Sequence, residues 1–159
     1  MRVEKSSSRE QRKPGADQPT LGAVATPISR PTGKARVLIV DDDLNIARTL
    51  QRILADDFDV VALTSPLEAF HLILAGRRFS AIVCDIRMPE LTGMELHEEI
   101  VRIAPRQAER MIFTTGGGLP AKLQMFAESK GVLSKPFDLD ELRRLVAAMT
   151  QQPHEATLG

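Results

Sequence analysis

Three carboxylates, one hydroxyl and one ammonium group stand at the ends of short apolar runs in this sequence. They belong to Asp41, Asp42, Asp85, Thr115 and Lys135. Clustered carboxylates repel one another, and a divalent cation relieves that repulsion without protonating them. Mg²⁺ prefers oxygen ligands and commonly takes one or two carboxylates together with phosphate oxygens. If these side chains meet in space, their types predict a magnesium site that handles a phosphoryl group.

Four residues are candidates to hold the metal ion. Asp42 and Asp85 suit direct ligation, whereas Asp41 would act through a water molecule. The backbone carbonyl of Arg87 would supply a further oxygen. An ionised aspartate beside Mg²⁺ can attack phosphorus and form an aspartyl phosphate, so the site is suited to covalent phosphoryl chemistry.

The other groups are candidates to bind the phosphoryl group. Phosphoryl transfer depends mainly on positioning and charge neutralisation, which the metal provides on one side and Lys135 on another. The Thr115 hydroxyl and the backbone amide of Gly116 would donate hydrogen bonds to the phosphoryl oxygens. The sequence therefore offers a complete set of groups for this reaction.

Five apolar runs alternate with longer amphipathic segments, and this alternation predicts the fold. The runs predict strands at residues 37–40, 57–63, 81–85, 111–115 and 132–134. Apolar spacing of three and four residues predicts a helix after each strand, with Asp43 capping the first. Strict alternation indicates a parallel sheet with helices on both faces. Ligands of such sheets bind beyond the carboxyl ends of the strands, where the polar residues stand.

Composition divides the chain and limits its function. Residues 1–34 are rich in Ser, Pro and Gly and predict a disordered arm or linker; residues 35–150 predict one domain, and 151–159 a tail. Lys and Arg (21) balance Asp and Glu (21), which gives no general attraction to nucleic acid or anionic lipid. The single cysteine, Cys84, suits a reducing cytoplasm. No apolar run approaches the roughly 18 residues of a membrane span.

Four segments resemble motifs of response-regulator receiver domains. Residues 37–43 resemble the strand that ends in the acidic pair, and residues 83–95 resemble the segment around the phosphorylated aspartate. Residues 113–116 and 134–137 are similar to the Ser/Thr and Lys-Pro-Phe motifs. The resemblance covers about residues 35–150. It implies a flavodoxin-like (βα)5 fold, a doubly wound five-stranded sheet, with Asp85 as the phosphoacceptor.

The same resemblance implies partners and a role in signalling. A histidine kinase or phosphotransfer protein would donate the phosphoryl group in a Mg²⁺-dependent reaction, and slow self-dephosphorylation would follow. The protein would then be no enzyme in the ordinary sense, because it catalyses only its own modification. About ten residues follow the last predicted helix. We therefore expect a stand-alone or hybrid-kinase receiver that signals through a downstream protein and binds neither DNA nor membrane.

Two positions depart from the family pattern. Many members have an aromatic residue three positions before the lysine, and its rotamer is coupled to the Ser/Thr. Here that switch position is Val132, so the coupling would depend on movement of Thr115 alone. Gly116, Gly117 and Gly118 follow Thr115 directly and leave the loop conformationally free.

Two other functions remain open from the sequence. A degenerate receiver would serve only as a scaffold and would not take label from acetyl phosphate. A phosphatase of the haloacid-dehalogenase type also uses an Asp nucleophile and Mg²⁺, and the triplet of Asp41, Asp42 and Asp43 superficially matches its Asp-x-Asp. However, Asn45 stands where that motif has Thr, and the chain leaves no room for a cap domain. Turnover of a generic phosphate ester would identify the phosphatase.

Overall fold

The apolar runs form five parallel strands in the computed structural model, which describes residues 33–153. The strands are β1 (Arg36–Val40), β2 (Asp59–Leu63), β3 (Ala81–Asp85), β4 (Met111–Thr115) and β5 (Leu133–Ser134). They pair in the order β2-β1-β3-β4-β5, and every neighbouring pair is parallel. This is the flavodoxin-like order of a doubly wound sheet. The predicted fold class is confirmed.

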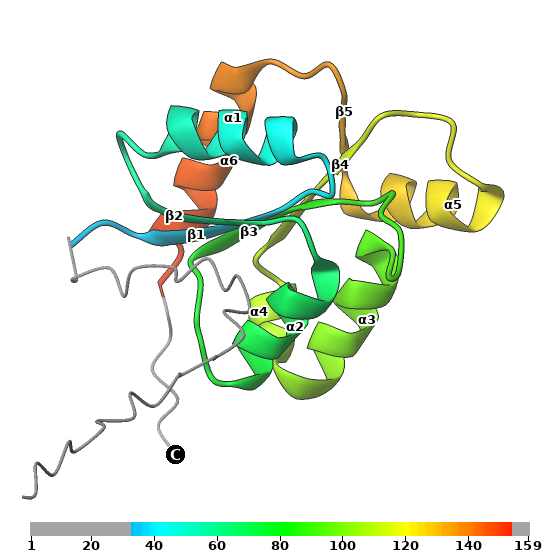
Figure 1. The fold of residues 1–159 in the computed structure, drawn as a ribbon, viewed down its shortest axis with the longest axis horizontal. Coiled ribbons are helices and arrows are strands. Elements are labelled where there is room, and N and C mark those ends of the chain that lie inside the picture. The colour runs from blue at the N-terminus through cyan, green and yellow to red at the C-terminus, as the bar shows by residue number, and fades with distance from the viewer. Residues whose placement is uncertain (1–32, 154–159) are drawn as a thin grey trace, which may run out of the picture.

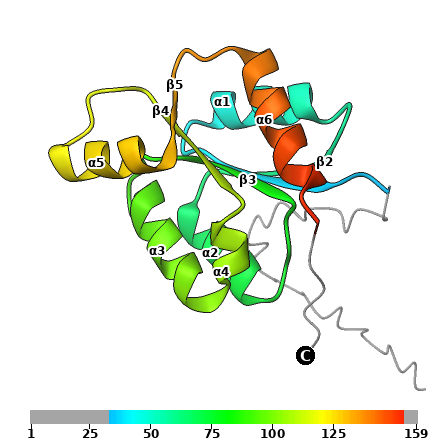
Figure 2. The same cartoon turned by 180° about the vertical axis from the view of Figure 1, so that it is seen from behind.

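Helices cover both faces of the sheet (Figures 1 and 2). They are α1 (Leu44–Leu54), α2 (Pro66–Leu74), α3 (Gly93–Ile103), α4 (Pro105–Ala108), α5 (Ala121–Lys130) and α6 (Leu139–Gln151). In Figure 1, α1 and α6 lie above the sheet, whereas α2, α3 and α4 lie below it. The helix α5 lies at the side, next to the β4 and β5 end of the molecule.

Each face of the sheet has its own hydrophobic core. Along β1, Val37 and Ile39 belong to the core under α1 and α6, and Leu38 and Val40 belong to the core over α2 and α3. All four side chains are fully buried. A strand covered on both faces is apolar without alternation, which explains the continuous apolar run in the sequence.

Side-chain caps fix where two site-forming helices begin. Asp43 ends the turn after β1, and its carboxylate accepts hydrogen bonds from the backbone of Asn45 and Ile46. Thr92 and Glu95 form a reciprocal capping box at the start of α3. The caps fix the ends of the loops that follow β1 and β3, so the polar residues at these strand ends are held at one edge of the sheet.

Some boundaries differ from the sequence-based expectation. The short helix α4 was not expected. The helix α5 begins at Ala121, and its N-cap residue, Pro120, makes no side-chain hydrogen bond to the helix. The helix α6 continues to Gln151, the first residue of the predicted tail. The predicted arm, residues 1–34, lies outside the described residues except for its last two, as does the tail from residue 154 onward. Between residues 33 and 153, no helix is long and apolar enough to cross a membrane.

Candidate functional site

Three carboxylates meet at the carboxyl edge of the sheet. Asp41 and Asp42 directly follow β1, and Asp85 is the last residue of β3, the strand that pairs with β1. Each carboxylate offers one oxygen, and these oxygens all lie within 4.8 Å of one another. Asp41 and Asp85 are 2% and 6% exposed, whereas Asp42 is open to solvent. Three hard oxygen donors in this arrangement fit Mg²⁺, with Asp42 on the solvent side.

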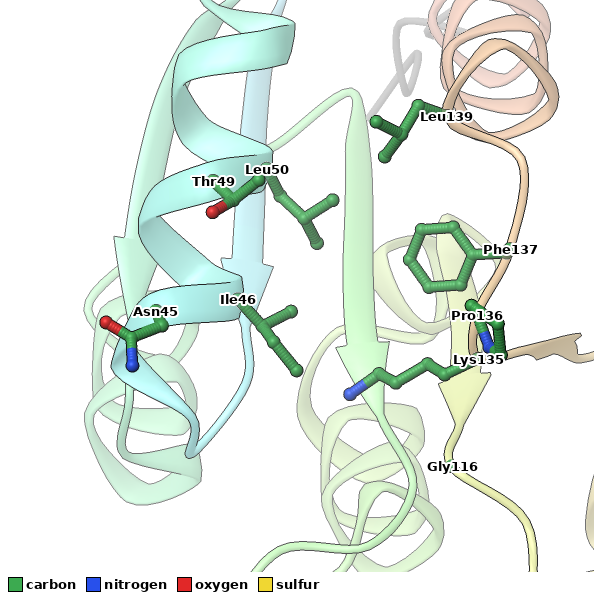
Figure 3. Close-up of a pocket in the computed structure, with 9 residues that line it drawn as sticks. All are labelled: Asn45, Ile46, Thr49, Leu50, Gly116, Lys135, Pro136, Phe137 and Leu139. Carbon is green, nitrogen blue, oxygen red and sulfur yellow. The ribbon is translucent and has the colours of Figure 1, made fainter.

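Lys135 brings a positive charge to these carboxylates. Its Nζ donates a hydrogen bond to Asp41 Oδ2 at 2.7 Å and lies 3.5 Å from Asp85 Oδ2. Figure 3 shows the extended Lys135 side chain reaching to the tip of the central strand, β3. Burial alone lowers the pKa of Lys135, but its hydrogen bond to Asp41 and the two carboxylate charges raise it overall. The lysine is therefore held as an ammonium ion beside the acids.

Asp85 is the carboxylate whose protonation depends most on its surroundings. Burial raises its pKa to about 6, assisted by the charges of Asp41 and Asp42, while Lys135 and the backbone N–H of Arg87 act to lower it. Its Oδ1 is buried and has no hydrogen-bond partner among the described residues. A buried acceptor without a partner is costly, so this oxygen is well suited to bind a cation or an electrophilic phosphorus.

Thr115 and Gly116 lie at the end of β4, next to the lysine segment. Thr115 is buried, and its carbonyl accepts a hydrogen bond from the Lys135 N–H at 2.6 Å. Its Oγ1 accepts a hydrogen bond from the Gly117 N–H at 3.2 Å. A hydroxyl has one donor and two acceptor sites, so the Thr115 O–H still has its proton to donate.

The other two predicted residues have different surroundings. Arg87 follows β3 by two residues, and its backbone N–H acts on Asp85, but its guanidinium donates to the carbonyl of Gly118 at 2.6 Å. Val132 is partly buried and packs against the core over α2 and α3. Because valine is aliphatic, this position cannot act as a switch in which an aromatic ring rotates between solvent and core.

Gly93 is a positioning residue that the sequence analysis did not single out. It begins α3, and its N–H donates to the Ile86 carbonyl at 2.9 Å. A Cβ at this position would lie 2.5 Å from the Asp85 carbonyl oxygen and 2.9 Å from Ile86 Cα. The glycine ahead of an apolar helix was a visible signal, but only the fold shows how closely α3 approaches the end of β3.

An apolar groove borders the site on one side (Figure 3). Its volume is about 570 Å³, and it lies between α1 and the segment that follows β5. Apolar side chains from both walls dominate its lining, namely Ile46, Leu50, Pro136, Phe137 and Leu139. Lys135 and Gly116 also line it, so the groove opens directly onto the group of charged residues.

Comparison with known proteins agrees with this geometry. The response regulator receiver domain family matches residues 37–147, which include all of the acidic, hydroxyl and lysine residues of the site. The chain belongs to this family. Relatives of the receiver domain include the transcriptional regulatory protein GlrR of Escherichia coli, 31% identical over 127 residues. They also include the transcriptional regulatory protein FixJ of Bradyrhizobium diazoefficiens, 30% identical over 128 residues.

Solved structures show the same fold. The receiver domain of a Francisella response regulator is 26% identical, with a TM-score of 0.61, over 74% of this chain and 97% of that one. A receiver domain protein from Clostridium thermocellum is also 26% identical, with a TM-score of 0.63, over 73% of this chain and 94% of its own. The receiver domain described here is therefore similar to these structures over nearly their whole length.

One expectation is corrected by these comparisons. The receiver was expected to make no direct contact with DNA, an expectation that rests on the short segment after its last helix. The relatives are transcriptional regulatory proteins, and the shared region covers 77% of this chain but 28% of GlrR, and 79% of this chain but 61% of FixJ. The chain thus spans only part of these relatives' length, and the segment after its last helix was no basis for excluding DNA. The expectation of no direct DNA binding conflicts with relatives that are transcriptional regulatory proteins, and it is wrong.

Proposed function

We propose that Asp85 accepts a phosphoryl group from a histidine kinase or a phosphotransfer protein in a Mg²⁺-dependent reaction. One observation carries the proposal: the buried Asp85 carboxylate, with its unpartnered Oδ1, lies between two further carboxylates and an ammonium group. Such a site combines a nucleophile with the means to neutralise an incoming dianion. The family relationship supports the same role in two-component signalling.

The residues present fit the metal. Asp42 and Asp85 would bind Mg²⁺ directly with the Arg87 carbonyl, and Asp41 would act through water while it holds Lys135. Bound there, the ion would neutralise the carboxylates and withdraw charge from the phosphoryl oxygens. The unpartnered Oδ1 of Asp85 is the observation that makes a cation fit here.

The chain's own residues would carry out the transfer as one balanced displacement. A carboxylate oxygen of Asp85 forms a bond to phosphorus as the phosphorus–nitrogen bond of the donor phosphohistidine breaks. The imidazole nitrogen leaves with that electron pair, so the acceptor gains an acyl phosphate. Lys135, the Thr115 hydroxyl and the Gly116 N–H stabilise the three phosphoryl oxygens during the transfer. With its pKa at about 6, Asp85 is largely ionised and nucleophilic at neutral pH.

The apolar groove supports a protein as the donor. Ile46, Phe137 and Leu139 present apolar surface beside the charged residues, with Lys135 at the junction. A small phosphate donor would need only the charged residues, whereas a protein can bury an adjoining apolar wall. We propose that the receiver domain modifies only itself and acts in the cytoplasm, where the single, buried thiol of Cys84 stays reduced.

Labelling of the protein tests the proposal. Purified protein is incubated with Mg²⁺ and either ³²P-labelled acetyl phosphate or a panel of autophosphorylated histidine kinases. Wild type should acquire a hydroxylamine-labile label, and Asp85→Asn or EDTA should abolish it. Asp43→Asn is the matched control, because Asp43 caps α1 outside the carboxylate cluster and Asn caps equally well. An equal label on Asp85→Asn, or no label on wild type, contradicts the proposal.

A further inference from the structure

The Arg87 guanidinium lies where two loops of the site meet. Arg87 belongs to the loop after β3, two residues beyond the proposed acceptor, and Gly118 belongs to the loop after β4. Arg87 Nη2 donates to the Gly118 carbonyl at 2.6 Å. Among residues 33–153, this carbonyl is the one hydrogen-bond partner of the guanidinium. A short contact with a neutral carbonyl therefore joins the acceptor loop to the segment that leads into α5.

The loop of residues 116–118 depends on few contacts. The backbone angles φ of Gly117 and Gly118 are 86° and 62°, and a Cβ on either would meet nothing within 4 Å. Two side chains hold the loop: Thr115 through the Gly117 N–H, and Arg87 through the Gly118 carbonyl. Arg87 follows Asp85 by two residues, and Thr115 ends β4, the strand that pairs with β3. The loop is thus held by two residues that lie close to Asp85, Arg87 along the chain and Thr115 on the neighbouring strand.

Phosphorylation would offer the guanidinium a better acceptor. Arginine forms charge-assisted and often bidentate hydrogen bonds to phosphate, which are roughly twice as strong as those to neutral acceptors. The Gly118 carbonyl is on an exposed residue, so water can replace Arg87 there at little cost. The exchange is therefore favourable once a dianionic group stands on Asp85.

We propose that Arg87 is a phosphoryl-binding residue that gives up the Gly118 carbonyl when Asp85 is modified. The inference rests on the proposed function of Asp85. In the unmodified protein Arg87 holds the loop; in the modified protein it binds phosphoryl oxygens, and the entry to α5 is released. The helix α5 is suited to respond, because it begins without a side-chain cap and Leu123 is its one buried residue. The receiver thus has a route from acceptor to helix that needs no rotating aromatic residue at Val132.

The test uses beryllofluoride, a mimic of the phosphoryl group, with Mg²⁺ and the full chain. Binding is followed by ¹⁹F NMR, and the Gly118 carbonyl is followed by its ¹³C chemical shift. In wild type, beryllofluoride should move the Gly118 signal toward its position in unliganded Arg87→Ala. Arg87→Ala should bind beryllofluoride roughly tenfold more weakly, the effect of one charge-assisted hydrogen bond. Arg87→Lys, which keeps the charge without the fork, should lie between the two.

The controls separate this inference from the proposed function. Arg102→Ala removes one positive charge from the exposed side of α3, where Arg102 pairs with Glu99, and should bind like wild type. Unchanged affinity in Arg87→Ala, or a Gly118 signal that beryllofluoride does not move, overturns the role of Arg87 alone. If wild type fails to bind beryllofluoride, or if Asp85→Asn binds it as tightly as wild type, the proposed function itself fails.

Discussion

At the scale of single residues, the site combines two opposed demands on Asp85. The carboxylate is buried, faces two other carboxylates and has an unpartnered oxygen, all of which disfavour its charge. Lys135 only partly offsets this, because its closest contact is with Asp41. Without a metal ion, the Asp85 carboxylate is therefore less stable in its ionised form than it would be in solvent. This strain on the native state is what ligand binding can relieve.

Replacing Asp85 with its neutral isostere should stabilise the metal-free protein. Folding raises the pKa of Asp85 from 3.8 to about 6, so the native state binds the proton more tightly than the unfolded state. The contribution of Asp85 to native stability is therefore greatest below its unfolded pKa of 3.8. It is lost as the pH rises through its folded pKa of about 6. In EDTA at about pH 8, Asp85→Asn should unfold with a free energy roughly 2 kcal/mol higher than wild type. Urea unfolding followed by far-UV circular dichroism measures it.

The pH dependence provides the control for that comparison. The advantage of Asp85→Asn should shrink as pH falls toward about 5, because wild type then takes up the proton that the substitution makes unnecessary. A gain that is independent of pH would mean that the substitution acts by packing and not by removing a charge.

At the scale of elements, strand order and close helix approach place the site. β1 and β3 are neighbours, so Asp41 and Asp42 lie beside Asp85, and Lys135 reaches Asp41 past the end of β4. The helix α3 starts against the acceptor strand because Gly93 has no side chain. Its capping box then fixes the start of the helix. The geometry of the strand end at Asp85 thus depends on Gly93, which has no side chain of its own.

A methyl group at Gly93 should disturb both stability and phosphorylation. In Gly93→Ala, the new Cβ would stand 2.5 Å from a backbone oxygen, which cannot move away as a flexible side chain could. Overpacking of this kind costs about 1–3 kcal/mol, and the displaced strand end should also slow labelling of Asp85. Urea unfolding measures the first effect and labelling with acetyl phosphate the second. For stability alone, Gly116→Ala is the control, because a Cβ there meets nothing within 4 Å; an equal loss in both variants would contradict this explanation.

The sequence allowed the elements and the convergence of side chains to be predicted better than the contacts within loops. Continuous apolar runs and the polar residue that ends each one are local features, so Asp85 and Lys135 could be assigned to strand ends before their 3.5 Å approach was known. The contact of Arg87 with Gly118 joins residues 31 positions apart across two irregular loops, and no periodicity signals it. The length after the last helix was misleading for DNA binding, because it describes this chain and not its longer relatives.

At the scale of the whole molecule, the helices bury their side chains unequally. The helix α3 buries Gly93, Met94, Leu96 and Ile100, whereas α5 buries Leu123 alone. Phe126 of α5 adds edge-to-face contacts with Phe113 and His97, at ring-centroid distances of 4.9 and 5.6 Å. The helix α5 is therefore held by fewer fully buried side chains than α3. Elements of low local stability are the ones that ligand binding can most readily reposition.

Metal binding should be visible in the stability of the entire domain. A ligand that binds only the native state raises the unfolding free energy, by about 2.7 kcal/mol when present at one hundred times its dissociation constant. Mg²⁺ should therefore raise the melting temperature of wild type, and EDTA should reverse the rise. Since the chain has no Trp or Tyr, calorimetry or far-UV circular dichroism is the appropriate measurement.

The melting temperature of Asp85→Asn should be higher than that of wild type without metal but should rise much less with Mg²⁺. The variant has lost one carboxylate ligand and with it the repulsion that the ion relieves. Asp43→Asn, outside the cluster, should respond like wild type. Equal gains in wild type and Asp85→Asn would place the ion elsewhere, even if Asp85 still accepted the phosphoryl group.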